Sequence, residues 1–214
     1  MKCMISLPGF RLTFTFSWKM LFLALLCIGI FIRLGFWQLH RAEEKRQLLK
    51  IYHHQQTLPP RSLTNIRTPM PYQVVKVEGQ FLNTNLLLDN QYHAHQFGYD
   101  VITPMLLKNG SIVLIDRGWC LGDATRLSFP KIKTPKDTQI ILGHVYFPSK
   151  KQWLLGPNID QRKNNLLIIE TINIAGLSQF LHKSLYPFII RQSADSKSKS
   201  NEYIRDWAII AVAP

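Results

Sequence analysis

The feature that most constrains this chain is an uninterrupted apolar segment near its N-terminus. Every position from 20 to 32 is apolar or glycine. Trp18 and Trp37 bracket the segment and lie 20 positions apart, counted inclusively. A helix of ~20 residues crosses the ~30 Å hydrocarbon core of a bilayer, and tryptophan is enriched at both membrane surfaces. We therefore predict a transmembrane helix over residues 18–37, preceded by an N-terminal tail, residues 1–17.

Two other interpretations of the apolar segment fit less well. A cleaved signal peptide would end in small residues of the A-x-A type, whereas this segment leads into Arg33, Leu34 and Gly35. A core helix of a small domain is not usually apolar on all sides. The basic residues nearby are Lys2, Arg11 and Lys19 before the core and Arg33, Arg41, Lys45, Arg46 and Lys50 after it. Taken alone, this count places the following domain on the cytoplasmic side.

The remainder of the chain divides into three parts. Residues 38–58 are rich in Glu, Lys, Gln, Arg and Leu, which predicts a membrane-proximal helix that continues from the anchor. Residues 59–71 contain four prolines and no periodicity, which predicts an extended linker. Residues 72–214 carry short apolar runs with few helical patterns. We predict an α+β protein: a mainly antiparallel β domain, a sandwich or barrel-like body, with an N-terminal transmembrane helix.

The strand pattern of residues 72–214 is interrupted by clear turn signals. Asn109 and Gly110 separate two apolar runs, the strongest short-range signal for a hairpin. Asn173 could cap a short helix that runs to about His182. A polar stretch over residues 193–201 predicts a loop. The predicted strands are residues 72–81, 86–88, 99–107, 111–115, 139–147, 166–171, 188–192 and 203–212.

The chain is strongly basic, with 26 Lys and Arg against 13 Asp and Glu and a net charge of +13. This balance favours contact with an anionic partner. Because the charges are spread along the chain and no recognition-helix or RNA-binding signature is present, we expect solvated loops near a lipid bilayer and no nucleic acid. Cys120 is the single cysteine beyond the anchor, so we expect no internal disulfide in that domain.

The standard catalytic and nucleotide-binding motifs are absent from the sequence. His93 and His95 would share one face of a strand, but two ligands do not make a metal site, and we interpret them as polar loop histidines. Trp37 and Arg41 share one helix face at the membrane surface. That face is either an interfacial anchor or a docking face for a membrane protein or a lipid-soluble cofactor, and His40 alone is weak evidence for haem ligation.

The segment Asp116-Arg117-Gly118-Trp119 ends an apolar strand and has two interpretations. In the structural one, Arg117 pairs with a carboxylate, Gly118 makes a turn and Trp119 covers the edge of the core. In the functional one, a planar cation beside an indole holds a ligand or partner that bears a carboxylate. Strand ends often carry such clusters, so we favour the structural interpretation.

Four segments together resemble the Surfeit locus protein 1 family of cytochrome c oxidase assembly factors. They are LGFWQLHR at residues 34–41 with Lys45, VEGQF at 77–81, GYDVITP at 98–104 and VLIDRGW at 113–119. Their order and spacing match the family over residues 34–120, and a weaker match includes Gly143 and the apolar ending.

The resemblance implies a non-enzymatic assembly factor for haem–copper cytochrome c oxidase, which assists haem A insertion or retention in subunit I alongside other assembly factors. It places the β-rich domain in the bacterial periplasm, with the anchor in the inner membrane, or in the mitochondrial intermembrane space if the protein is eukaryotic. This contradicts the charge count, which rests on a difference of two charges. Trp37, Gln38, His40 and Arg41 would then face the partner or haem A. The alternative is a membrane-anchored binding or scaffolding module with no cofactor role.

The residues that the resemblance points to in the β domain form an expected structural cluster, namely Gly98, Tyr99, Pro104, Asp116, Arg117, Gly118 and Trp119. Asp116 stands where the family usually has Asn, and Asp100 stands where His is common. The family also ends with a second membrane helix, which would begin where this sequence ends, at Pro214. Haem A contact is therefore expected to be transient, and no haem ligand can be assigned in this chain.

Overall fold

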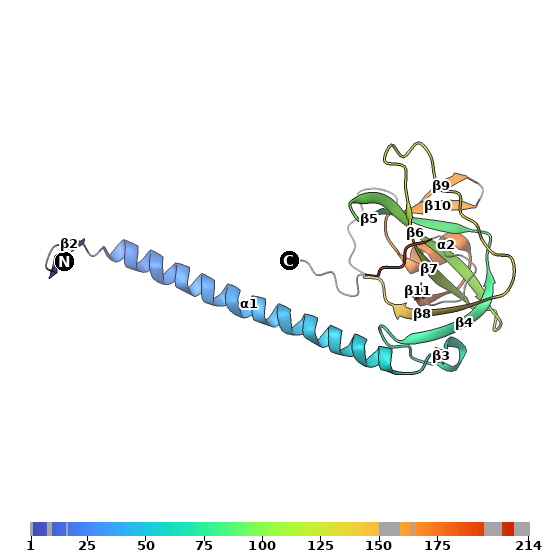
Figure 1. Ribbon diagram of the computed structural model, residues 1–214, viewed down its shortest axis with the longest axis horizontal. Coiled ribbons are helices and arrows are strands. Elements are labelled where there is room, and N and C mark those ends of the chain that lie inside the picture. Colours follow the sequence, from blue (N-terminus) through green and yellow to red (C-terminus); the bar gives the residue numbers. More distant parts are fainter. Residues whose placement is uncertain are drawn as a thin grey trace. The chain divides into compact units, whose positions relative to one another are not determined.

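The computed structural model describes residues 2–7, 10–15, 17–149, 159–163, 165–194 and 203–207. It divides into two units, Met1–Lys50 and Ile51–Pro214, and each is described by itself (Figure 1). The first unit begins with the antiparallel pair β1 (Lys2–Leu7) and β2 (Phe10–Thr15), where a tail was expected. It then enters α1 (Trp18–Thr57), a single helix of 40 residues that continues into the second unit.

Helix α1 is long and apolar enough to cross a membrane. Its most apolar 18-residue window has a mean hydropathy of 2.3, and none of that window is buried. The helix runs without a break through the predicted transmembrane and membrane-proximal segments. The long run of good helix formers after Trp37 explains why the helix does not stop at the end of the apolar run.

The second unit is a closed, mainly antiparallel β-barrel with extra strands on one side (Figure 1). The strand order is β3-β4-β8-β11-β7-β6-β5-β10-β9, and β4 also pairs with β6, which closes β4, β8, β11, β7 and β6 into a ring. Among the described residues, six of the nine pairings in this sheet are antiparallel. The α+β, barrel-like prediction is therefore confirmed.

The bounds of the elements in this unit follow the chain. They are β3 (Arg61–Ser62), the 3-10 helix η1 (Leu63–Asn65), β4 (Val74–Phe81), β5 (Asn85–His93), β6 (Gln96–Leu107), β7 (Ile112–Leu121), β8 (Gln139–Tyr146), β9 (Ile159–Lys163), β10 (Leu166–Ile169), α2 (Ile174–Leu181) and β11 (Leu185–Gln192).

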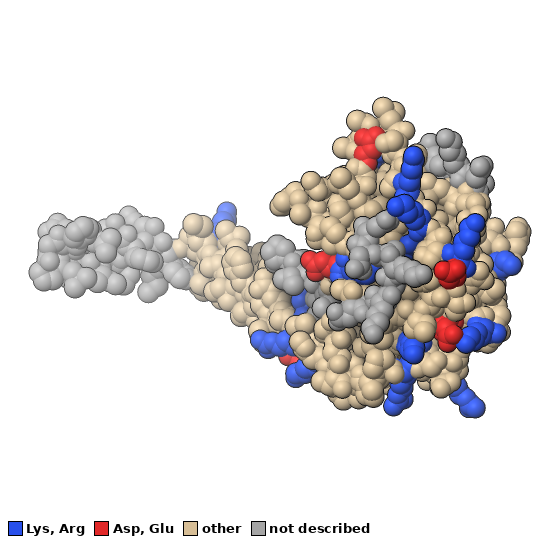
Figure 2. Space-filling view, turned by 45° about the vertical axis from the view of Figure 1, so that its right-hand side comes forward, with Lys and Arg blue, Asp and Glu red and all other residues tan. Residues whose placement is uncertain are grey.

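Charged side chains occupy both the surface and the interior of this unit. On the face shown in Figure 2, Lys and Arg are scattered over the barrel rather than gathered into one patch. Among the described residues, the acidic and basic side chains that are nevertheless buried are Asp89, Asp100, Asp116 and Arg117. Buried charges are unusual unless they are paired or hydrogen-bonded, so these residues mark where a site should be sought.

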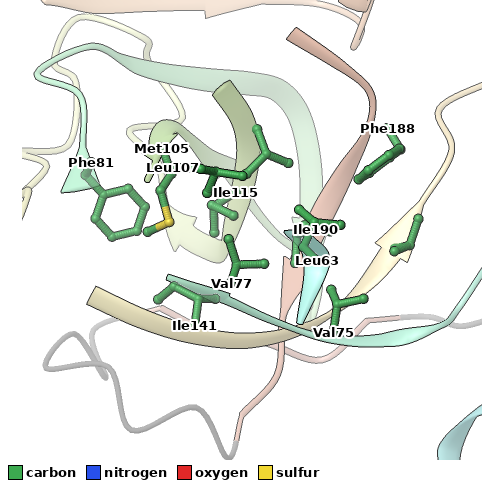
Figure 3. Close-up of a cluster of buried hydrophobic side chains, with 12 residues drawn as sticks. Leu63, Val75, Val77, Phe81, Met105, Leu107, Ile115, Ile141, Phe188 and Ile190 are labelled. Carbon is green, nitrogen blue, oxygen red and sulfur yellow. The ribbon is translucent and has the colours of Figure 1, made fainter. Parts of the chain in front are cut away.

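An apolar cluster fills the barrel interior (Figure 3). Strand β4 shows how it forms, because Val75, Val77 and Phe81 point inward and alternate with outward-facing residues. Leu63, in the segment expected to be an extended linker, is 2% exposed and belongs to the same cluster. The other members are Met105, Leu107, Val113, Ile115, Ile141, Val145, Phe188 and Ile190.

Helix α2 covers part of the outer face of the barrel. The side chain of Asn173 accepts a hydrogen bond from the backbone N–H of Gly176 at 3.1 Å, which confirms the predicted cap. The helix buries Leu177 in a second cluster with Leu114 and Ile189, which alternate with the inward-facing residues of β7 and β11.

Several boundaries differ from the sequence-based prediction. Strand β7 continues through residues 116–121, beyond its predicted end at 115, and β5 is longer than predicted. Within the predicted strand at 203–212, the described residues 203–207 hold one isolated bridge, at Ile204. Most of the predicted loop at 193–201 lies outside the described residues.

Candidate functional site

The candidate site is built on an irregularity in the β6–β7 pair. Asp100 pairs with Trp119 and Ile102 pairs with Asp116, so one residue of β6 lies opposite two residues of β7, Arg117 and Gly118. This extra residue is a β-bulge, a feature that redirects side chains at the rims of barrels. Gly118 has φ +120°, a conformation that side chains rarely adopt, which explains glycine at this position.

The residue before the glycine, Arg117, is fully buried. It donates hydrogen bonds to the backbone carbonyl of Lys133 at 2.8 Å and to the hydroxyl of Thr103 at 3.4 Å. Its guanidinium carbon lies 5.2 Å from the ring centroid of Phe81 and 4.9 Å from that of Tyr203. Arg117 therefore connects strand β7 to residues outside it, through its hydrogen bond to Lys133 and its contacts with the rings of Phe81 and Tyr203.

The C-terminal described segment, residues 203–207, packs on the bulge. Trp119 and Ile204 exchange two backbone hydrogen bonds, at 2.8 and 2.9 Å. Arg205 donates from Nε to the carbonyl of Arg117 at 3.0 Å. A Cβ added to Gly118 would lie 2.6 Å from the carbonyl oxygen of Ile204. The glycine therefore also permits the close approach of this segment.

A second arginine, the half-buried Arg191, lies beside Asp116 in the parallel pair of β11 and β7. Its Nε is 3.6 Å from Oδ2 of Asp116. Its guanidinium carbon lies 3.7 Å from the ring centroid of Tyr146 and 5.1 Å from that of Trp207. Trp207 is held in turn by a hydrogen bond from its Nε1 to the carbonyl of Gln192 at 2.8 Å. Arg191 is thus fixed by a carboxylate and two aromatic rings.

These residues surround a cavity of about 180 Å³. Asp100 and Arg191 line it, together with rings of Trp119 and Trp207. Its other lining residues are Gln91, Tyr92, His93, Ile204 and Asp206. The cavity lies outside the apolar barrel core, because it shares no residue with the interior cluster.

Burial changes the acid–base behaviour of the two aspartates at this site. Burial of Asp100 raises the pKa of its carboxyl from 3.8 to about 6, against the opposing charge of Arg191. Burial of Asp116, reinforced by the charge of Asp100, raises the pKa of its carboxyl well above the usual range. Two carboxyls that share a single guanidinium favour retention of a proton or capture of a cation.

The other members of the expected structural cluster are also buried in this hairpin. A Cβ on Gly98 would lie 2.5 Å from the ring of Trp119, so glycine lets the indole lie across β6. Tyr99 is 1% exposed and packs with Leu87. The carbonyl of Pro104, in the middle of β6, accepts a hydrogen bond from the backbone N–H of Leu82 at 2.8 Å.

The histidines and the cysteine of the hairpin do not form a metal or nucleophile site with their described neighbours. His95 lies in the tight β5–β6 turn with φ +63°, and the His93 ring packs 5.4 Å from the ring of Trp119. Burial raises the pKa of the Cys120 thiol to about 11, which keeps it protonated. The described part of the chain contains no group of three or more potential metal ligands.

The predicted membrane-surface residues lie on α1 in the first unit. Trp37 is 63% exposed, and Gln38 is also exposed. His40 and Arg41 both contact Glu44, at 3.5 and 3.1 Å, one helical turn further on. Trp37, His40, Arg41 and Glu44 therefore form one continuous face at i, i+3 and i+4 spacing.

Sequence reasoning did not identify Arg191 and Trp207 as site residues. Asp100 drew attention only as a departure from the family pattern. A signal for Arg191 exists, because a charged residue follows directly on the buried run Phe188, Ile189 and Ile190. Nothing local links it to Asp116, since their contact arises only from the parallel pairing of β11 with β7.

Fold and site together define a class: a small β-barrel domain joined to an N-terminal helix long enough to span a membrane. The SURF1 family model matches residues 25–212. A SURF1-like protein of Rickettsia conorii is 32% identical over 183 residues, covering 84% of this chain and 73% of the relative. One of Rickettsia felis is 32% identical over 180 residues, covering 83% and 76%, and one of Rickettsia prowazekii is 31% identical over 188 residues, covering 86% and 73%.

The chain therefore belongs to the SURF1 family. Members of this family are cytochrome oxidase assembly factors rather than enzymes. The match begins inside the apolar part of α1 and runs through the barrel, so it includes both the helix face and the bulge region. The resemblance stated from the four sequence segments is confirmed.

Proposed function

We propose that this protein is a membrane-bound assembly factor that binds subunit I of a haem–copper cytochrome c oxidase and assists haem A insertion or retention there. The observation that carries the proposal is the family match over residues 25–212. Other assembly factors would bind the same complex. In this proposal the barrel unit lies on the outer side of the membrane, which is the periplasm in a bacterium or the intermembrane space in a mitochondrion.

The face Trp37–His40–Arg41 of α1 supports contact with a membrane partner. Trp37 ends the apolar run and the next polar residues begin there, so this face lies at the depth of the lipid headgroups when the helix spans a bilayer. An exposed Trp and Arg are residues enriched at binding hot spots. A single partner could therefore bury both side chains at the membrane surface.

The surroundings of His40 do not support haem A as a permanently bound group at this face. The His40 side chain is 79% exposed and lies 3.5 Å from Glu44 on the same helix. A haem ligand needs a pocket that excludes water and orients the imidazole. We therefore assign no haem ligand to this chain, and we propose that any contact with haem A is transient and made at the interface with the partner.

A second candidate function follows from the same observation. An exposed His40 without a pocket also fits a scaffold that holds oxidase subunits together without touching haem. The two proposals differ in one respect, which is whether haem A copurifies with the protein and its partner after the membrane is solubilised.

Purification of the tagged full-length protein from solubilised membranes tests both proposals. We expect subunit I to copurify, and haem A in the same fraction favours the first proposal over the scaffold. Trp37→Ala and Arg41→Ala should each lose most of the bound subunit I, because truncation of a buried hot-spot side chain costs about 2 kcal/mol or more, roughly thirtyfold in affinity.

Arg46→Ala provides the matched control. Arg46 is also an exposed arginine on α1, and it contacts Glu43 at 3.7 Å. It should retain subunit I at the level of the parent protein. Equal retention of subunit I by all three variants would show that the proposed face is not the docking site. Absence of subunit I from the parent preparation would contradict the proposed function itself.

A further inference from the structure

The cavity beside the β7 bulge is lined by both charged and aromatic side chains. It is lined by Asp100, Asp206 and Arg191 as well as by the aromatic residues Tyr92, Trp119 and Trp207. All of these belong to the barrel unit, whereas the helix face of the proposed function belongs to the first unit. An inference about this cavity therefore does not rest on the proposed function.

Within the described residues, the carboxyl of Asp100 lines this cavity without a hydrogen-bond donor. Its exposure is 8%, so more than nine-tenths of it is buried. Arg191, the nearest cation, places its Nε against Asp116. Among the described residues, no side chain or backbone group donates a hydrogen bond to the Asp100 carboxyl. The completely buried atoms without a partner near this site belong to Asp116 and Arg191. The oxygens of Asp100 are not among them, so they are open to the cavity and accessible to a ligand in it.

The balance of charge at the cavity indicates the sign of that ligand. Two carboxyl groups, those of Asp100 and Asp206, line the cavity with one guanidinium, that of Arg191, which also lies against the carboxyl of Asp116. This local balance is opposite to that of the whole chain, which carries a net charge of +13. An anionic ligand would add a further negative charge beside these carboxyls, whereas a cation would pair with Asp100.

The aromatic wall indicates the shape of the ligand. Tryptophan and tyrosine rings contact an alkyl chain through their apolar faces and attract an ammonium group through the negative charge on those faces. We propose that this cavity binds an alkylammonium group, with the ammonium on Asp100 and the alkyl stem between Trp119 and Trp207. Such a group belongs either to a lysine side chain of a partner polypeptide or to a free small amine.

Binding should depend on pH in a defined direction. Burial raises the pKa of the Asp100 carboxyl to about 6, and a bound cation needs that carboxyl ionised. The titratable and charged groups that surround it are Asp116 and Cys120 on β7, Arg191 on β11, His93 on β5 and Asp206 on the C-terminal segment. From pH 7 to pH 5 the ionised fraction of Asp100 falls about tenfold, so the apparent affinity should fall by about the same factor.

Titration of the full-length protein in detergent with n-butylammonium tests the proposal, with tryptophan fluorescence and calorimetry as readouts. We expect saturable binding at pH 7, weakening about tenfold at pH 5, and no binding of the neutral analogue butan-1-ol or of the anion butyrate. Binding of butyrate in preference to butylammonium, or butylammonium binding that does not change between pH 7 and pH 5, would overturn the proposal. The pH arm requires no mutation, so it remains decisive if a variant fails to fold.

Asp100→Asn should lose butylammonium binding by at least tenfold, whereas Glu170→Gln, an exposed carboxyl outside the cavity, should bind as the parent protein does. Equal binding by Asp100→Asn and the parent would also overturn the proposal. A short peptide with one internal lysine, compared with the same peptide acetylated at Nε, identifies the source. Binding of the unmodified peptide alone supports a partner lysine, and binding of butylammonium without the peptide supports a free amine.

Discussion

Replacement of Asp100 by asparagine should stabilise the protein near neutral pH. Burial raises the pKa of the Asp100 carboxyl from 3.8 to about 6 in the folded protein. Between these two pH values the folded state therefore binds more protons than the unfolded state, and the free energy of unfolding falls as the pH rises. At 1.36 kcal/mol per pH unit, this interval corresponds to about 3 kcal/mol of stability lost above pH 6.

Asparagine has nearly the same shape as aspartate, but its side chain does not ionise in this pH range. Asp100→Asn should therefore match the parent protein near pH 4 and exceed its free energy of unfolding by up to about 3 kcal/mol at pH 7, a rise in melting temperature of about 6–12 °C. Part of the pH dependence should remain, because burial also raises the pKa of Asp116.

Urea unfolding of the full-length protein in detergent at pH 4 and pH 7, followed by tryptophan fluorescence, measures these differences. Glu170→Gln, which removes an exposed carboxyl, is the control and should follow the parent at both pH values. A variant Asp100→Asn less stable than the parent at pH 7 would refute the reasoning, since it would mean that the ionised carboxyl makes stabilising interactions.

Three further outcomes follow from the geometry. Gly118→Ala should lower the free energy of unfolding by at least about 2 kcal/mol, because residue 118 has φ +120° and the Cβ of alanine would collide with the Ile204 carbonyl. A urea midpoint equal to that of the parent protein would contradict this prediction. Asn173→Ala should cost about 1 kcal/mol in the same assay through loss of the α2 cap, with Asn173→Ser as the rescuing variant. Iodoacetamide should modify Cys120 about a hundredfold more slowly in the folded than in the urea-unfolded protein, because burial raises the pKa of the thiol from 9.0 to about 11. Equal rates of modification, measured by peptide mass spectrometry, would show that the thiol is accessible and ionised in the folded protein.

The parts of this fold that sequence can predict are those set by near neighbours in the chain. The apolar run and its tryptophans predict α1, and the Asn109–Gly110 pair predicts the β6–β7 hairpin, where Gly110 adopts φ +80°. Asn173 caps α2 as expected from its side chain alone. Each of these signals acts within a few residues, so no knowledge of distant partners is needed.

The parts that sequence could not predict depend on distant partners. Closure of the barrel requires β4 to pair with both β8 and β6, and no local pattern encodes that second pairing. Arginine is normally exposed, so the full burial of Arg117 requires the rings of Phe81 and Tyr203, which come from opposite ends of the domain. The cavity could not be predicted either, because Asp100, Arg191 and Trp207 meet only in the folded barrel.

The role in oxidase assembly is tested most directly by the haem a content of membranes. Deletion of the gene in a host that carries it, followed by reduced-minus-oxidised difference spectra, reports assembled haem A independently of any binding assay. We expect a marked loss of the haem a band and of cytochrome c oxidase activity, both restored by the full-length gene and poorly restored by its Arg41→Ala variant. A deletion strain with a normal haem a band and normal oxidase activity would contradict it.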